Sequence, residues 1–237
     1  MTPIRPPTTH DITSTGVLPE GRRVGLDGRR VPILRGRIHQ AAVIPAMLAA
    51  ATLTITAPRP AGKAAFAVFG VSVAAMLAAS AFYHCHARSA STKLQARRLD
   101  HAMIFVAIAG TQTAYWLLAA PATVAAPMIA LGWIAAGFGI RHKFRHLRLS
   151  TSTGSWLYAA LGWMSVAMVP FLVDAGADVL LLVAAGGLVY SVGAAFLVAR
   201  SVDPWPRVFG YHEVWHLLVV VGVATHGAGI VVLTHGR

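Results

Sequence analysis

Two histidines near the end of the chain have the spacing of metal ligands. His212 and His216 stand in the stretch GYHEVWH at residues 210–216. A spacing of i, i+4 puts both imidazoles on one face of a helix, where two nitrogens can reach the same ion. Two histidines at a membrane edge could equally be interfacial residues with satisfied hydrogen bonds. A third ligand must therefore decide between the two interpretations.

The glutamate between these histidines suggests a second kind of chemistry. His212, Glu213 and His216 fit the pattern H-E-x-x-H, in which two histidines bind zinc and the glutamate is the general base of a metalloprotease. The five-residue pattern is weak by itself. A protease of this kind would also need an acidic ligand from a distant helix, and Asp100 is the only candidate in the sequence.

The elements that must position these residues are membrane-spanning helices. Of the 237 residues, 56% are hydrophobic and only 12% are charged, a composition that excludes an ordinary soluble domain. Seven apolar runs are each long enough to cross a bilayer, and they predict an all-α membrane protein with a seven-transmembrane helix bundle. The runs are 38–57, 62–84, 100–119, 123–140, 155–173, 178–199 and 208–233.

The distribution of Lys and Arg predicts the orientation of the bundle. Seventeen of the 20 Lys and Arg lie in the N-terminal residues or in the connections after the second, fourth and sixth runs. Because cytoplasmic connections hold the excess of Lys and Arg, we expect a cytosolic N-terminus and a C-terminus outside. The net charge of +12 then reflects topology and contact with anionic lipid head groups, and nucleic acid is not an expected partner.

The N-terminal residues differ in composition from the rest of the chain. Residues 1–37 are rich in Pro, Thr, Gly and Arg and contain no apolar stretch of signal-peptide length. We interpret 1–37 as a disordered basic tail and 38–237 as the transmembrane domain.

The predicted topology brings three helix ends to one depth. The run 62–84 ends on the cytosolic side at His84, whereas the helices that carry Asp100 and the pair His212 and His216 begin there. Three histidines with an open fourth position form the ligand set of a catalytic zinc site. Asp100 could instead complement the dipole at the start of its helix, and a lone His84 is commonly a packed residue.

The neighbours of His84 differ in what they can contribute. Ser80 lies one turn earlier on the same face, where its hydroxyl could bond a water at the metal, a substrate carbonyl or a backbone carbonyl. Consecutive helical residues point about 100° apart, so Cys85 and His86 are not expected to bind the same ion.

The remaining histidines are not expected in the metal site. His101 is predicted to face away from Asp100. His226 lies ten residues beyond His216, about 15 Å further along the helix axis, and could hydrogen-bond within the bundle. The other histidines are interpreted as tail, loop or interfacial residues: His10, His39, His142, His146 and His235.

Three stretches of the sequence resemble the hemolysin III family, which belongs to the larger group of the progestin and adiponectin receptors. They are SAFYH at 80–84, LDH at 99–101 followed by GTQT at 110–113, and GYHEVWH at 210–216 followed by His226. The likeness covers residues 38–235. It implies a seven-helix bundle in which His84, His212 and His216 hold zinc near the cytosolic face. It also implies that Asp100 holds the water at the zinc, with Ser80 close by.

The sequence departs from the family at Gln112, where many relatives have an aromatic residue, but this position is not among the ligands. Members of the group are described as hemolysins, as membrane-homeostasis proteins and, in animal relatives, as receptors with ceramidase-like hydrolysis. The resemblance therefore specifies the fold and the metal site more closely than it specifies the activity.

Residues and resemblance together predict a multi-pass plasma-membrane protein with its metal site near the cytosolic face. The expected activity is zinc-dependent hydrolysis of a membrane lipid amide or ester in membrane homeostasis, with membrane lipids as partners and Asp100 taking the proton. A non-enzymatic pore-forming or receptor-like protein with structural zinc is the alternative, and an intramembrane metalloprotease is a further one. Against a pore, no predicted helix shows a polar stripe through the full membrane depth.

Overall fold

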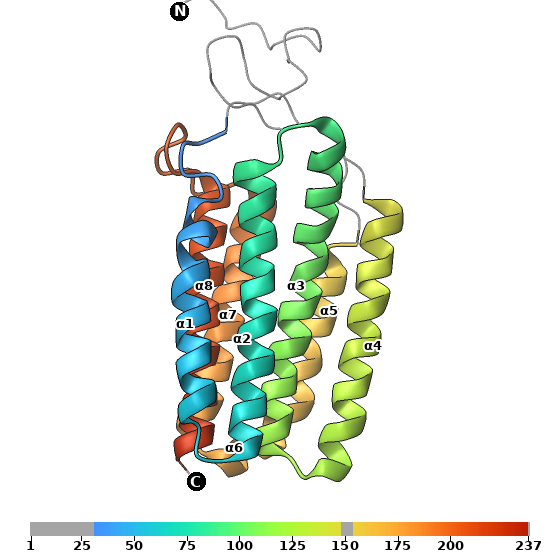
Figure 1. The fold of residues 1–237 in the computed structure, drawn as a ribbon, viewed down its shortest axis with the longest axis vertical. Helices are drawn as coiled ribbons and strands as arrows, with labels where there is room; N and C mark the ends of the chain where they lie inside the picture. Colours follow the sequence, from blue (N-terminus) through green and yellow to red (C-terminus); the bar gives the residue numbers. More distant parts are fainter. Residues whose placement is uncertain (1–30, 148–153, 237) are drawn as a thin grey trace, which may run out of the picture.

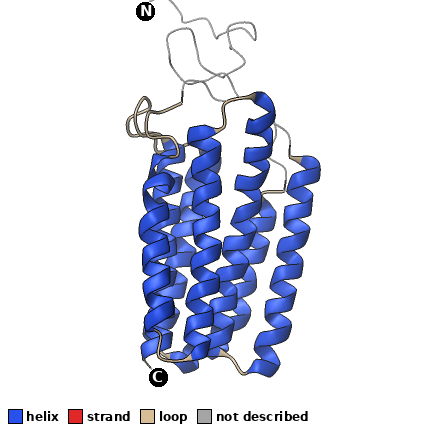
Figure 2. Ribbon diagram, viewed as in Figure 1, coloured by secondary structure: helices blue, strands red, loops and turns tan. Residues whose placement is uncertain are grey.

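The computed structural model describes residues 31–147 and 154–236, and this part of the chain is built almost entirely of helices (Figure 2). The helices are α1 Arg37–Thr56, α2 Pro60–Ala81, α3 Ala90–Ala119, α4 Ala122–His146, α5 Trp156–Trp163, α6 Val169–Ala175, α7 Ala177–Ala199 and α8 Tyr211–His235. The π-helical turn η1, Phe82–His86, follows α2 directly, and the 3-10 turn η2, Met164–Met168, joins α5 to α6.

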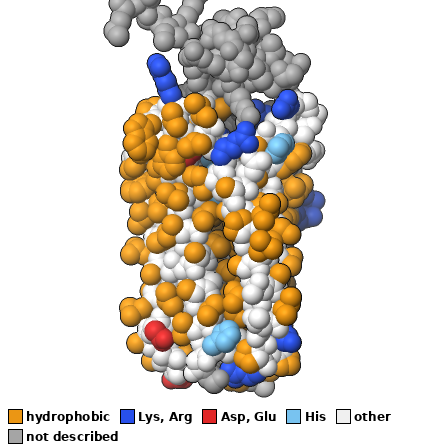
Figure 3. Space-filling model, turned by 60° about the vertical axis from the view of Figure 1, so that its left-hand side comes forward, with side chains coloured by type: hydrophobic (Ala, Val, Ile, Leu, Met, Phe, Trp, Pro, Cys, Tyr) orange, Lys and Arg blue, Asp and Glu red, His pale blue; other side chains and the backbone are white. Residues whose placement is uncertain are grey.

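These helices form seven spans that are long and apolar enough to cross a membrane, since α5, η2 and α6 together make one span from Trp156 to Ala175. The spans lie side by side in one bundle (Figure 1). Hydrophobic side chains cover most of the face shown in Figure 3, with Lys and Arg mainly near its ends. The predicted all-α, seven-helix membrane bundle is confirmed. We call the end where α1 and α8 begin and α2 ends the upper end, as in Figure 1.

Helix α3 begins ten residues before the apolar run that predicted it. The Ser89 side chain accepts a hydrogen bond from the backbone N–H of Thr92 at 3.2 Å, which caps the helix at its true start. The polar residues that follow are helix formers but are not apolar, so hydropathy did not include them. Asp100 consequently lies well inside α3, and the interpretation of Asp100 as a residue that complements the helix start is wrong.

Helix α2 ends in the π-helical turn η1, which carries His84, Cys85 and His86. The backbone N–H of Ala87 donates to the carbonyl of Phe82 at 3.0 Å, five residues back, and this bond closes the wider turn. A π turn changes the directions in which its side chains point, and such turns are frequent at functional sites. The turn therefore contributes to the placement of His84.

Small residues allow the helices to approach closely. A Cβ added at Gly70 on α2 would collide with the side chain of Ala50 on α1, and one added at Gly222 on α8 would collide with the ring of Tyr190 on α7. Lipid is as apolar as a leucine side chain, so helices in a bilayer associate by close packing and hydrogen bonding. Glycine at these contacts permits that packing.

We predict that Gly70→Ala destabilises the protein by about 1–3 kcal/mol, because the added methyl group forces α1 and α2 apart. Gly137→Ala on α4 is the matched control, since a Cβ there meets nothing within 4 Å. This control should be neutral or up to about 1 kcal/mol more stable, because alanine is the better helix former. Thermal unfolding of the purified variants in detergent measures both effects. Equal stabilities would contradict the proposed close contact.

Candidate metal centre

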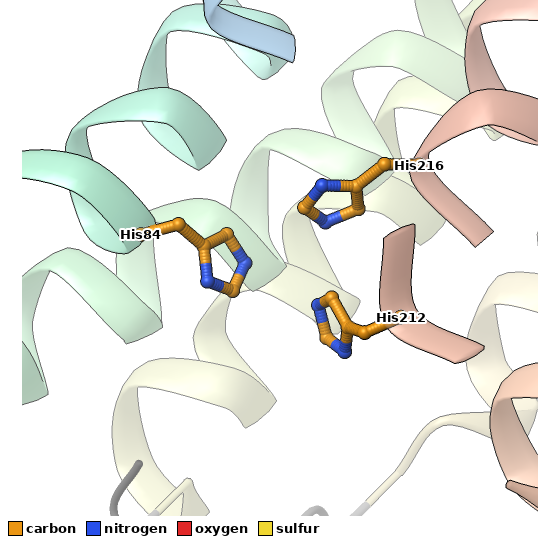
Figure 4. A group of neighbouring side chains, drawn as sticks. All are labelled: His84, His212 and His216. Atoms are coloured by element: carbon orange, nitrogen blue, oxygen red, sulfur yellow. The ribbon is translucent and has the colours of Figure 1, made fainter. Parts of the chain in front are cut away.

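Three histidines from two helical segments converge at the upper end of the bundle. His84 comes from η1, and His212 and His216 come from the first two turns of α8. Each offers one ring nitrogen, and the three nitrogens lie within 4.8 Å of one another. Figure 4 shows each ring turning a nitrogen toward a common centre. His84 and His212 are half-buried and His216 is buried, so the group is partly shielded from solvent.

The arrangement fits a divalent metal ion with a preference for nitrogen ligands. An ion midway among three atoms this far apart lies at most about 2.8 Å from each, so shifts under about 1 Å reach the Zn–N length of 2.0–2.1 Å. Three imidazoles leave a fourth tetrahedral position for water or substrate. The group could therefore hold a catalytic type of ion with little rearrangement.

The neighbours that the sequence excluded as ligands are also outside this group. The buried Cys85 thiol lies 3.6 Å from the backbone carbonyl of Arg35, to which it donates. His86 is exposed, with its Nε2 3.5 Å from Nε2 of Gln40. Nδ1 of His101 is 3.0 Å from the Tyr158 hydroxyl, which in turn donates to the His101 carbonyl.

His226 is farther along α8 and is buried against α3 and α7. Its ring stacks on Tyr190 with centroids 5.5 Å apart, and the Tyr115 hydroxyl donates to its backbone carbonyl at 2.9 Å. Its Nδ1, however, has no hydrogen-bond partner in the part of the chain that the structure describes. We expected this side chain to form a hydrogen bond within the bundle, and its Nδ1 forms none with the described residues.

Asp100 and Ser80 form a polar pair between α3 and the segment that carries His84. The Ser80 hydroxyl is within hydrogen-bonding reach of the Asp100 carboxylate, and Ser80 is almost completely buried. Ser80 lies one turn before His84 on the same chain segment, so it links α3 to the segment that carries His84. Asp100 is not within ligand distance of the three nitrogens. The pair is thus near the centre without belonging to its ligand set.

Glu213 does not face the centre, although it stands between two of its histidines. One carboxylate oxygen accepts the backbone N–H of Gly210 at 2.9 Å, in a bond that caps the first turn of α8. The other forms an ion pair with Nε of Arg35. The side chain is completely buried. Because both oxygens are occupied, Glu213 fixes the start of α8 and is poorly placed to act as a general base.

Arg35 belongs to a short segment, residues 32–36, that crosses the upper end; we call it the strap. The backbone N–H groups of Ile33 and Leu34 each donate at 3.1 Å, to the carbonyls of Arg207 and Val208. Gly36 packs directly against the side chains of His84 and Cys85 with a φ of 79°, so a larger residue there would meet both strain and collision. The strap thereby joins α1, η1 and α8. Residues 1–30 of the predicted tail lie outside the described residues.

The ion pair also affects the charge around the centre. Arg35 is close enough to His84, His212 and His216 for its charge to act on all three. A free guanidinium at that position would repel a metal cation. Pairing with the buried Glu213 carboxylate offsets part of this charge and so reduces the repulsion of a divalent ion.

His39 also belongs to this region, although the sequence did not predict it there. His39 lies in the first turn of α1 and stacks on His216, with ring centroids 4.0 Å apart and planes 14° from parallel. Only 3% of its surface is exposed, so its interpretation as a tail, loop or interfacial residue is wrong. A signal was present, because the predicted topology puts the start of the first helix at the depth of His84 and His212.

Fold and site together define a polytopic α-helical membrane protein with a three-histidine centre at one end of its bundle. Residues 29–227 match the family model described as "Haemolysin-III related". The chain belongs to this family. Its centre combines residues from the first and third of the stretches that resemble the hemolysin III family.

Curated relatives agree with this assignment. The chain is 31% identical to "Hemolysin-3 homolog" of Bacillus subtilis (strain 168), over 67% of this chain and 72% of the relative. It is 32% identical to "Hemolysin-3" of Bacillus cereus, over 68% and 70%. It is also 33% identical to "Heptahelical transmembrane protein ADIPOR2" of Oryza sativa subsp. japonica, over 72% and 82%. The likeness therefore extends from bacterial to plant members.

We predict that Arg35→Ala destabilises the protein by about 3 kcal/mol or more, because it leaves the Glu213 carboxylate buried without its counter-charge. Arg37→Ala is the control, since the exposed side chain of Arg37 donates only to the nearby Gln40 among the side-chain contacts of the described residues, at 2.6 Å. The control should change stability by less than about 0.5 kcal/mol. Chemical unfolding in detergent measures the difference. A loss in Arg35→Ala no larger than that in Arg37→Ala would show that the pair does not hold α8.

Proposed function

We propose that this protein is a zinc-dependent hydrolase that cleaves an amide or ester bond of a membrane lipid, in the service of membrane homeostasis. The observation that carries the proposal is the convergence of three histidine nitrogens that, among residues 31–147 and 154–236, have no fourth protein ligand in their group. Structural zinc sites usually have four protein ligands, whereas catalytic sites keep one position open. The open position favours a catalytic ion over a purely structural one.

In this proposal His84, His212 and His216 hold the ion, and Asp100 is the general base. When bound, zinc polarises a substrate carbonyl and lowers the pKa of water toward neutrality. Asp100 accepts the proton of the attacking water and returns it to the leaving group. The contact with Asp100 supports a positioning role for Ser80, whose hydroxyl orients the carboxylate toward the centre.

A lipid substrate is supported by the location of the centre. The three histidines belong to membrane-spanning segments, at their ends, where the head groups and the linkage bonds of lipids lie. The Lys and Arg bias supports a cytosolic location for this end, and in a protein of the plasma membrane the proposed substrate is then a lipid of the cytosolic leaflet. Its linkage can reach the ion while its chains stay among the helices or in the bilayer.

The metalloprotease alternative has less support than the hydrolase. Its general base would be Glu213, and both carboxylate oxygens of Glu213 are occupied by Gly210 and Arg35. A pore is also less supported. At mid-depth on α3 the Gln112 amide donates to the Leu161 carbonyl at 2.7 Å and to the Ser165 hydroxyl at 3.1 Å, so these polar groups bond to a neighbouring helix. The relatives named hemolysin nevertheless make lysis worth measuring.

We predict that the purified protein binds about one zinc ion per chain. The double variant His84→Ala, His212→Ala should bind essentially none, because a single remaining imidazole cannot hold the ion. His86→Ala is the matched control, since His86 lies on the same turn but outside the group, and it should keep the wild-type content. Elemental analysis after dialysis gives these values. Undiminished zinc in the double variant would exclude this centre.

We predict that Asp100→Asn keeps its zinc and lowers the hydrolysis of a fluorogenic lipid amide or ester by about 10²–10⁴-fold, through loss of the general base. Glu213→Gln leaves Arg35 without its counter-charge and should bind zinc more weakly. Assayed at equal zinc content it should keep most of its turnover, because the amide oxygen can still accept the Gly210 N–H. The opposite ranking would favour the protease mechanism. Dye-loaded liposomes containing the wild-type protein provide the test for lysis, and dye release without hydrolysis would replace the enzyme with a pore.

A further inference from the structure

His39 is a buried histidine whose ring nitrogens lack hydrogen bonds. Its Nδ1 and Nε2 are both buried, and neither has a partner among residues 31–147 and 154–236. One of them approaches the backbone of His216 without the alignment of a hydrogen bond. A buried polar atom without a partner is costly, and native structures nearly always supply one, which is frequently a water molecule. The ring nitrogens of His39 are therefore available to a hydrogen-bonding molecule at this place.

The position of His39 indicates where that molecule lies. Its ring is 4.0 Å from the ring of His216, one of the three histidines of the centre. It is thus at the same centre, but it comes from α1, a third helical segment that contributes no member of the three-histidine group. A water between His39 and the three histidines would satisfy a nitrogen of His39 and lie within reach of an ion.

The stacking geometry argues against His39 as a fourth ligand. An ion binds in the plane of an imidazole ring, on the line of the nitrogen lone pair. The planes of His39 and His216 are only 14° from parallel and are separated by roughly the ring spacing of 4.0 Å. An ion in the plane of His216 is therefore out of line with the nitrogens of His39, whereas a water beside that ion can turn a hydrogen or a lone pair toward them.

The strap holds His39 in this position. Arg35, four residues before His39, pairs with Glu213, and Gly36 rests on His84. Both contacts attach the start of α1 to the residues that flank the three histidines. The stacked ring also limits rotation of the His216 imidazole, whose own Nδ1 has no partner in the described chain. A hydrogen bond to the second ring nitrogen usually orients a ligand histidine, and here the stacked ring of His39 can take that role.

We propose that His39 is a positioning residue of the metal centre: it holds the His216 ring by stacking and hydrogen-bonds the water that shares the centre with the ion. This inference rests on the metal site of the proposed function but not on the identity of the substrate. It assigns to α1 a direct part in the centre.

The test measures metal binding by the purified full-length protein, with Zn²⁺ and Co²⁺ as the probes. His39→Phe keeps a stacking ring and removes both nitrogens, His39→Gln restores a hydrogen-bonding group, and His86→Phe is the control on the exposed side of η1. Zinc affinity is measured by competition with a chelator, and the geometry at the ion is followed by the visible absorption of the cobalt form. Thermal unfolding of the metal-free variants checks that each is folded.

We expect His39→Phe to bind one ion with about 10–100-fold lower affinity and an altered cobalt spectrum, the range that is typical of residues that orient metal ligands. His39→Gln should recover part of the affinity, and His86→Phe should match the wild type. Wild-type affinity and spectrum in His39→Phe would overturn the proposal, as would complete loss of the ion, which would make His39 a ligand. A wild-type protein without metal would refute this proposal and the hydrolase together, whereas a metal-binding protein that hydrolyses no lipid would refute only the hydrolase.

Discussion

The buried Glu213 carboxylate holds together the end of the bundle on which the centre depends. It accepts the backbone N–H of Gly210 and pairs with Arg35, so the first turn of α8 and the strap are fixed to one group. The strap in turn contacts His84 through Gly36. A charge buried this completely is stable only with its partners in place, and the ligand-bearing segments are therefore constrained in relation to each other.

The bilayer imposes a different constraint on the rest of the bundle. Without a hydrophobic force between helices in lipid, association relies on close contacts such as Gly70 with Ala50 and on hydrogen bonds such as Gln112 with the Leu161 carbonyl. These contacts are distributed over the membrane depth, whereas the strap and the three histidines are at one end. The bundle can thus act as a rigid support for chemistry at its upper end.

The centre combines a metal-ligand set with groups that control its surroundings. Arg35 would oppose a cation if it were unpaired, and the ion pair with Glu213 reduces that repulsion. In the proposed mechanism Ser80 orients Asp100 from one side, and the proposed role of His39 orients His216 from the other. The base and one of the three ligands would then each be held by a residue on another segment, which is how metal sites commonly fix their geometry.

The sequence by itself determined the seven spans and the grouping of His84, His212 and His216, because hydropathy and the i, i+4 spacing are local properties and the Lys and Arg bias gives the depth of each helix end. Local patterns did not show that α3 starts at Ala90, since its first turns are polar and helical at once. Only the tertiary structure decided the roles of Glu213 and His39. Glu213 faces Arg35, and His39 faces His216, across 178 and 177 residues of chain. Such partners are chosen by packing between helices, which no pattern within one helix specifies.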